Sequence, residues 1–157
     1  MYSQKVLKHF QNPHNYGEMK NPDGVGRVGN LVCGDVMWVY VKIGKNKKKE
    51  EYIKDIKFKT YGCTAAIATS SMVTDLVKGK TIQKALSVSK NEIIDSLDGL
   101  PPIKIHCSIL ATEALNEAIY DYLKKQKREI PSAILAKHKT SEKEQEILDK
   151  KHKNCRS

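Results

Sequence analysis

The chain has 157 residues, of which 39% are hydrophobic, enough for one domain with a core and too few for two. No run approaches the roughly 18 consecutive apolar residues of a membrane span. The N-terminus also lacks the apolar stretch of a secretory signal, so we expect a cytoplasmic protein that does not bind membranes. The net charge is +10, but residues 124–157 alone hold 11 Lys and Arg against 5 Asp and Glu. Because the charge gathers in this tail, without interleaved aromatic residues, a basic nucleic-acid-binding module stays a remote alternative.

The first half of the chain predicts one helix followed by strands. Ser3 is a candidate N-cap of a short helix that Pro13 ends. Residues 36–43 and 53–61 are rich in β-branched and aromatic side chains, which predicts two strands of a hairpin. The turn between them carries four lysines that we expect to be solvated: Lys45, Lys47, Lys48 and Lys49.

The second half predicts helices. Apolar residues recur at helical spacing over residues 65–78, and again over residues 107–126, which we expect to be the longest helix. Between them, Ser89 and Glu92 form the capping box of a shorter helix. Further capping-box residues, Ser141 and Glu144, predict that a polar helix begins in the charged tail. The element order is therefore helix, strands, helices.

Three of the four cysteines lie where a predicted element begins. Cys63 precedes one helix and Cys107 starts another, positions at which free backbone N–H groups and the helix dipole favour a thiolate. Cys33 lies at a loop-to-strand junction. Cys155 stands among charged residues near the C-terminus, and we expect no function for it. In a reducing cytoplasm these side chains are free thiols or metal ligands.

The spacing of the cysteines limits their chemistry. Cys33, Cys63 and Cys107 are 30 and 44 residues apart, and no C-x-x-C occurs, which excludes zinc ribbons and ferredoxin-like runs. Three similar thiols fit a shared ligand site better than an enzyme with one activated cysteine. Soft thiolates select iron–sulfur clusters, zinc or copper(I). Asp35 and His106 are candidate further ligands, although Asp35 could instead hold a turn, His106 could cap a helix, and any single cysteine could be a buried hydrophobe.

Three longer motifs carry a family resemblance. They are Cys33-Gly34-Asp35, then Thr60-Tyr61-Gly62-Cys63 followed by residues 65–68, and residues 100–110, which read LPPIKIHCSIL. On these motifs the chain resembles the IscU/NifU family of iron–sulfur cluster assembly scaffolds over about residues 1–125. The resemblance implies an α+β, SufE/NifU-like fold: a three-stranded antiparallel sheet, its extra strand near residues 24–32, packed against several helices that include a long C-terminal one.

The resemblance also implies a function. A [2Fe-2S] cluster would be assembled from iron and from sulfur supplied by a cysteine desulfurase, and then passed to ferredoxin and other apo-proteins. Cys107 would accept persulfide sulfur, and Cys33 and Cys63 would complete the site. Asp35 would favour release of the cluster, with His106 as an alternative fourth ligand. The protein would be a scaffold rather than an enzyme, and a homodimer is the candidate assembly of its cluster-bound form.

One segment resembles the family's binding site for an Hsp70-type chaperone, which works with a co-chaperone. Ile103 stands there where Val is usual. The residues of this chaperone segment are Leu100, Pro101, Pro102, Ile103 and Lys104.

The main alternative is a zinc-dependent, SufU-like sulfur acceptor, which would use the same cysteines and aspartate. That branch usually has an insertion between its second and third cysteines and lacks the preceding histidine, so the 44-residue spacing and His106 favour the scaffold. Zinc fits the same thiolates. We expect residues 1–126 to form the scaffold domain and residues 127–157 to be a charged, partly helical C-terminal extension.

Overall fold

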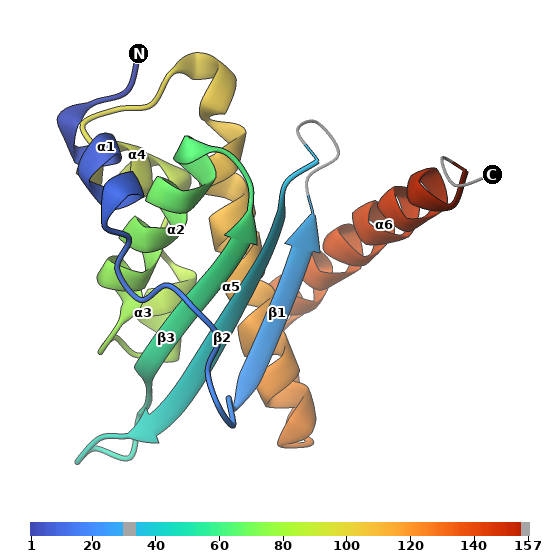
Figure 1. Ribbon diagram of the computed structural model, residues 1–157. Helices are drawn as coiled ribbons and strands as arrows, with labels where there is room; N and C mark the ends of the chain where they lie inside the picture. The colour runs from blue at the N-terminus through green and yellow to red at the C-terminus, as the bar shows by residue number, and fades with distance from the viewer. Residues whose placement is uncertain (30–33, 155–157) are drawn as a thin grey trace.

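A three-stranded antiparallel sheet with helices packed on it organises the chain (Figure 1). The computed structural model describes residues 1–29 and 34–154. The predicted α+β fold is confirmed, as is each predicted strand. The elements, in chain order, are α1 Gln4–Gln11, β1 Gly24–Gly29, β2 Val36–Lys45, β3 Glu51–Tyr61, α2 Thr64–Val77, α3 Ile82–Leu86, α4 Lys90–Ser96, the 3-10 helix η1 Pro102–Lys104, α5 His106–Lys125 and α6 Ser132–Asn154.

The sheet has the order β1-β2-β3, with β2 in the middle. Strands β2 and β3 form the predicted hairpin, in which Val36 pairs with Tyr61 at one end and Lys45 with Glu51 at the other. Asn46 closes the lysine-bearing turn, because its side-chain oxygen accepts backbone N–H bonds from Lys48 and Glu50. The hairpin therefore has a defined register, which determines which residues lie side by side at its open end.

Helix α5 packs on β1 and β2, and α2 packs on β3 and on α5. Alternate residues of β2 and β3 face this helical layer and are buried, as the pleat of a strand requires. Glycine makes the closest approach possible: a Cβ on Gly26 would lie 2.2 Å from the backbone oxygen of Ala114 in α5. The sheet and α5 are thus in backbone contact, and α5 is held at a fixed depth.

The predicted helix starts at Ser3, Ser89, Cys63 and Cys107 are confirmed. Ser3 caps α1 by accepting the backbone N–H of Val6, and Ser89 with Glu92 forms the capping box of α4. Cys63 is the N-cap residue of α2, and Cys107 is the second residue of α5. Within residues 1–29 and 34–154, no helix is both long and apolar enough to cross a membrane.

Two predictions are wrong: where the tail helix begins, and that residues 107–126 form the longest helix. Helix α6 begins at Ser132 and continues through Ser141, so Ser141 and Glu144 do not start it, and its 23 residues make it longer than α5. The earlier start follows from packing: Ile134 is buried against α5, and its carbonyl accepts a bond from Asn116. The ring of His138 also stacks on Tyr120 of α5, with centroids 3.7 Å apart. The far end of α6 projects away from the sheet (Figure 1).

The contact between α5 and α6 contains a carboxyl group that disfavours it at neutral pH. Burial, reinforced by the carboxylates of Glu144 and Glu117, raises the pKa of Glu113 to about 7, while Lys137 opposes the shift. Because this pKa is raised in the folded chain, the protonated Glu113 side chain contributes to the stability of the fold. This contribution is fully present below the ordinary pKa of 4.5 and is lost as pH rises through about 7.

We predict that Glu113→Gln flattens this pH dependence. At pH 8 the variant should exceed the parent in free energy of unfolding by about 1–3 kcal/mol, because no buried charge forms. Denaturant unfolding at pH 5 and pH 8 measures the effect. Glu146→Gln, at an exposed position on α6, is the control and should leave the parent's pH dependence in place. Equal pH dependence in Glu113→Gln and the parent would contradict the prediction.

Candidate functional site

Two thiols and a carboxylate meet at one end of the sheet. Asp35 immediately precedes β2, Cys63 is the N-cap residue of α2, and Cys107 lies in the first turn of α5. One ligand atom from each of the three lies within 4.8 Å of the others. The two sulfur atoms are 3.6 Å apart. Three of the five residues predicted as ligands are therefore brought together from elements far apart in the sequence.

The strand register places Asp35 at this site. Val36 pairs with Tyr61, so the residue before β2 must lie beside the residues that follow β3. Gly62 leaves the room that this requires, since a Cβ there would lie 2.9 Å from the Asp35 carboxyl carbon. Gly34 has a φ of +74°, a left-handed conformation that glycine adopts without strain. The local geometry thus favours glycine at both positions next to the ligands.

The site is buried at its base and partly open above. Cys107 is fully buried, Asp35 is 7% exposed, and Cys63 is half-buried. The Asp35 Oδ2 atom is buried and has no hydrogen-bond partner among the described residues. A buried carboxylate oxygen is costly unless it is paired or bound to a metal. This unpartnered oxygen, together with two adjacent soft sulfurs, fits an iron-containing cargo or a zinc ion.

Two further residues act electrostatically at the site. The thiolate form of Cys63, and secondly Tyr2, raise the pKa of Lys104, with smaller effects from Cys107 and Asp35. Burial, and secondly Cys63, raise the pKa of Tyr2, while Lys104 opposes this. The Lys104 cation therefore lies within electrostatic reach of the thiol site. Lys104 was predicted only as part of the chaperone segment, and Tyr2 was not predicted, because it is far from the cysteines in the sequence.

The remaining predicted ligands are placed differently. His106 precedes Cys107 but is not part of the three-residue group, and its buried Nε2 has no hydrogen-bond partner among the described residues. Cys33 and Cys155 lie outside the described residues. A side chain not predicted from the sequence, Thr69 of α2, donates a hydrogen bond to the backbone oxygen of Cys107 at 3.3 Å. This bond ties the start of α5 to α2 directly at the site.

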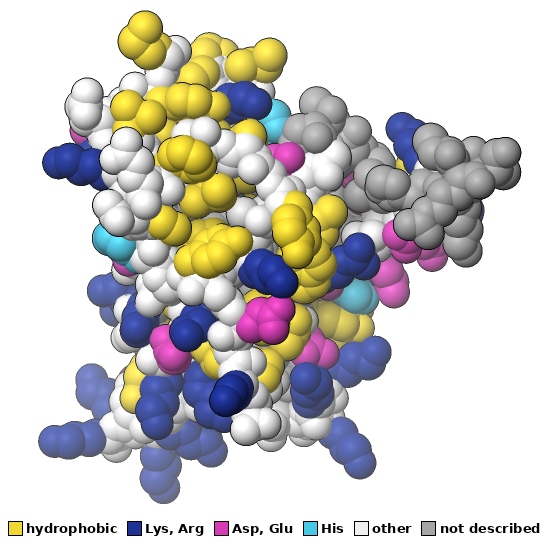
Figure 2. Space-filling model, in the orientation of Figure 1, with side chains coloured by type: hydrophobic (Ala, Val, Ile, Leu, Met, Phe, Trp, Pro, Cys, Tyr) yellow, Lys and Arg dark blue, Asp and Glu magenta, His cyan; other side chains and the backbone are white. Residues whose placement is uncertain are grey.

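The predicted chaperone segment lies beside the site and is partly displayed to solvent. Ile103 is 78% exposed and Pro102 is also exposed, whereas Leu100 packs against the core. Hydrophobic side chains gather at the end of the molecule where α2 and α5 begin (Figure 2). Lys and Arg side chains gather at the other end, around the turn between β2 and β3. The molecule therefore presents an apolar end, where Cys63 and Cys107 lie, and a basic end at the turn between β2 and β3.

Comparisons with known proteins identify the family of this chain. Residues 1–129 match the model of the NifU-like N terminal domain. The iron-sulfur cluster assembly scaffold protein IscU 1 of Archaeoglobus fulgidus is 54% identical over 125 residues, which cover 80% of this chain and 78% of that protein. The scaffold protein IscU of Escherichia coli is 49% identical over 131 residues, which cover 82% of this chain and 97% of that protein.

A solved structure shares the fold. It is a putative iron-sulfur cluster assembly scaffold protein for the SUF system from Fervidobacterium islandicum, with a TM-score of 0.61 and 24% identity. The match covers 75% of this chain and 96% of that one. At this identity the likeness concerns the fold alone. From the matched domain and the two relatives at about half identity, this chain belongs to the NifU-like N-terminal domain family.

Proposed function

We propose that this chain is a scaffold on which an iron–sulfur cluster, [2Fe-2S], is assembled from iron and desulfurase-derived sulfur and then transferred to apo-proteins. The observation that carries the proposal is the convergence of Cys63, Cys107 and the unpartnered carboxylate of Asp35 within 4.8 Å. Relatives that cover most of this chain are named as scaffolds of this kind. Cys33 completes the proposed ligand set, and His106 is its alternative fourth member.

Sulfur delivery would use the two described thiols differently. In persulfide transfer, a thiolate of the scaffold takes the outer sulfur from a desulfurase cysteine, which leaves as a thiolate. Cys107 is the proposed acceptor, but its side chain is fully buried, whereas Cys63 is partly exposed and 3.6 Å away. Delivery to Cys107 therefore requires either movement at the start of α5 or passage through Cys63.

Release of the cluster would depend on Asp35. Carboxylate oxygen is a harder ligand than thiolate, so mixed ligation holds iron less durably than four sulfurs. The exposed Pro102 and Ile103 beside the site would present the segment to an Hsp70-type chaperone. Ferredoxin and other apo-proteins are the proposed acceptors, a homodimer is the proposed cluster-bound form, and the cytoplasm is the proposed location. In this scheme the protein is a scaffold, and the desulfurase is the catalyst.

A zinc-dependent sulfur acceptor is the second candidate. Thiolate and carboxylate ligands in this arrangement suit tetrahedral zinc as well as iron. In that case the same thiols would carry persulfide onward and no cluster would form on the chain.

The first prediction about the proposed function concerns the ligands. Cys63→Ala or Cys107→Ala should each abolish stable cluster binding after anaerobic reconstitution, because each removes one of two adjacent sulfurs. Cys33→Ala should do the same if it completes the set. Visible absorption and iron content per chain measure the yield. Cys155→Ala is the matched control and should match the parent; a parental yield in any of the other three variants removes that cysteine from the ligand set.

A second prediction concerns lability. Asp35→Ala should assemble a cluster but release it to an apo-ferredoxin at least several-fold more slowly, because the hard, charged ligand is gone. Circular dichroism of the acceptor follows the transfer under anaerobic conditions. Asp98→Ala, which removes an exposed carboxylate, is the control. Transfer at the parental rate from Asp35→Ala, or no cluster on it at all, would shift the role to His106.

A third prediction concerns the domain boundary. We propose that residues 1–126 are the scaffold domain, because every described site residue precedes Gln126. A chain that ends at Gln126 should unfold cooperatively and assemble as much cluster as the parent, at a lower Tm because the contacts of Ile134 and His138 with α5 are lost. Thermal unfolding by circular dichroism tests this. A non-cooperative transition would show that α6 belongs to the domain.

A further inference from the structure

A second group of ligating side chains lies outside the thiol site. His9 comes from the end of α1, His14 from the loop that follows it, and Asp75 from the last turn of α2. One ligand atom from each lies within 4.8 Å of the others. Cys63 and Asp75 stand at opposite ends of α2, and 12 residues of helix separate them by about 18 Å. The two groups share no residue.

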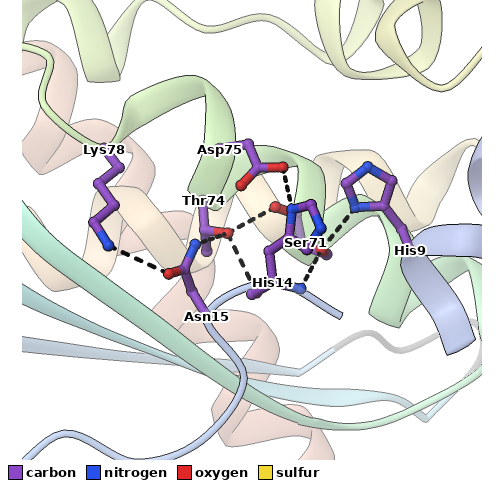
Figure 3. Close-up of polar contacts among 7 residues, drawn as sticks. All are labelled: His9, His14, Asn15, Ser71, Thr74, Asp75 and Lys78. Atoms are coloured by element: carbon purple, nitrogen blue, oxygen red, sulfur yellow. Dashed lines mark hydrogen bonds and ion pairs between the residues drawn. The ribbon is translucent and has the colours of Figure 1, made fainter. Parts of the chain in front are cut away.

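A buried hydroxyl group positions the histidines of this group. Ser71 of α2 is fully buried; its Oγ hydrogen-bonds His9 Nδ1 at 2.7 Å and accepts the backbone N–H of His14 at 2.8 Å. Figure 3 shows the ring of His14 next to Asp75 and the ring of His9 next to Ser71. Their centroids are 4.8 Å apart. One internal side chain thus sets the position of both histidines.

Neighbouring bonds hold the loop in place. Asn15 donates to the buried Thr74 hydroxyl at 3.0 Å, and Lys78 reaches the side-chain oxygen of Asn15 at 3.5 Å. Supporting bonds of this kind orient metal-binding histidines in proteins and reduce the cost of organising them. The ligands themselves stay accessible, since the side chain of His14 is 56% exposed and that of Asp75 is 36% exposed.

The protonation states also suit a cation. Burial, and secondly His14, lower the pKa of His9, so its ring is neutral and has a lone pair at neutral pH. His14 Nδ1 and Asp75 Oδ2 are 2.6 Å apart, close enough for both atoms to face one bound ion. Two imidazoles and one carboxylate, with open positions for water, are a donor set for divalent zinc or iron. Soft thiolate ligands are absent from the group.

We propose that His9, His14 and Asp75 form a second site, which binds a divalent transition-metal ion independently of the thiols. The ion would bridge the end of α1 and the last turn of α2, with water completing its coordination. This inference does not depend on the proposed scaffold function.

Zinc is the probe, because it is redox-inert and binds both classes of ligand. Under anaerobic, reducing conditions the full chain should bind two zinc ions in equilibrium dialysis, one at each site. His14→Gln, which keeps a side chain able to hydrogen-bond Asp75, should lose one of them, and Asp75→Asn should bind it about 10–100-fold more weakly. Cys107→Ser should lose only the other ion.

The matched control is His138→Gln. His138 is also paired with a carboxylate, that of Glu117 at 2.8 Å, but belongs to neither described ligand group, so this variant should keep both ions. Imidazole resonances of the parent provide a readout that does not depend on the folding of any variant: those of His9 and His14 should shift together when the second ion binds. Equal zinc content in His14→Gln and the parent, or unshifted resonances of these two rings, would each overturn the proposal.

Discussion

The pairing of Val36 with Tyr61 is the constraint on which the site depends. It fixes the end of the β2–β3 hairpin, and so places Asp35 against Gly62 and next to Cys63. A shift of one residue would turn alternate side chains of β2 away from the helical layer, so the buried face of the strand holds this register. The site is thus defined by the same burial that stabilises the sheet.

The second half of the site comes from the depth of α5. Because Gly26 lets the helix backbone contact β1, the first turn of α5 reaches the end of the sheet, and the Cys107 sulfur lies 3.6 Å from that of Cys63. Helix α2 links the thiol site to the His9, His14 and Asp75 group, since it carries Cys63 as its N-cap residue and Asp75 in its last turn. Burial at the base and exposure of Ile103 beside the site then give a centre that is held firmly but can be approached from one end of the molecule.

Local patterns in the sequence predicted the local structure well. Strand composition, the caps at Ser3 and Ser89, and the positions of Cys63 and Cys107 at helix starts are all confirmed, because each depends on neighbours a few residues away. The third strand came from the family resemblance alone. The predicted start of α6 was wrong, since burial of Ile134 on α5 outweighs the capping pattern at Ser141.

The contacts that sequence analysis missed depend on long-range packing. Tyr2 is far from Cys63 and Cys107 in the sequence, and no periodicity marks its electrostatic interaction with them. The group of His9, His14 and Asp75 was missed for the same reason, because 61 residues separate its carboxylate from the nearer histidine. Charge and spacing identify candidate ligands, whereas the register of a sheet and the depth of a helix decide which of them meet.

The most direct test of the central claim is anaerobic reconstitution of the full chain with ferrous iron, cysteine and a cysteine desulfurase, followed by visible absorption and by iron and sulfide content. If the converging thiols and Asp35 hold a cluster under assembly, the protein should become coloured, with iron and acid-labile sulfide in equal amounts, and should lose both to an apo-ferredoxin. A colourless chain whose thiols keep a tightly bound zinc ion and carry only persulfide would contradict the account and favour the sulfur acceptor.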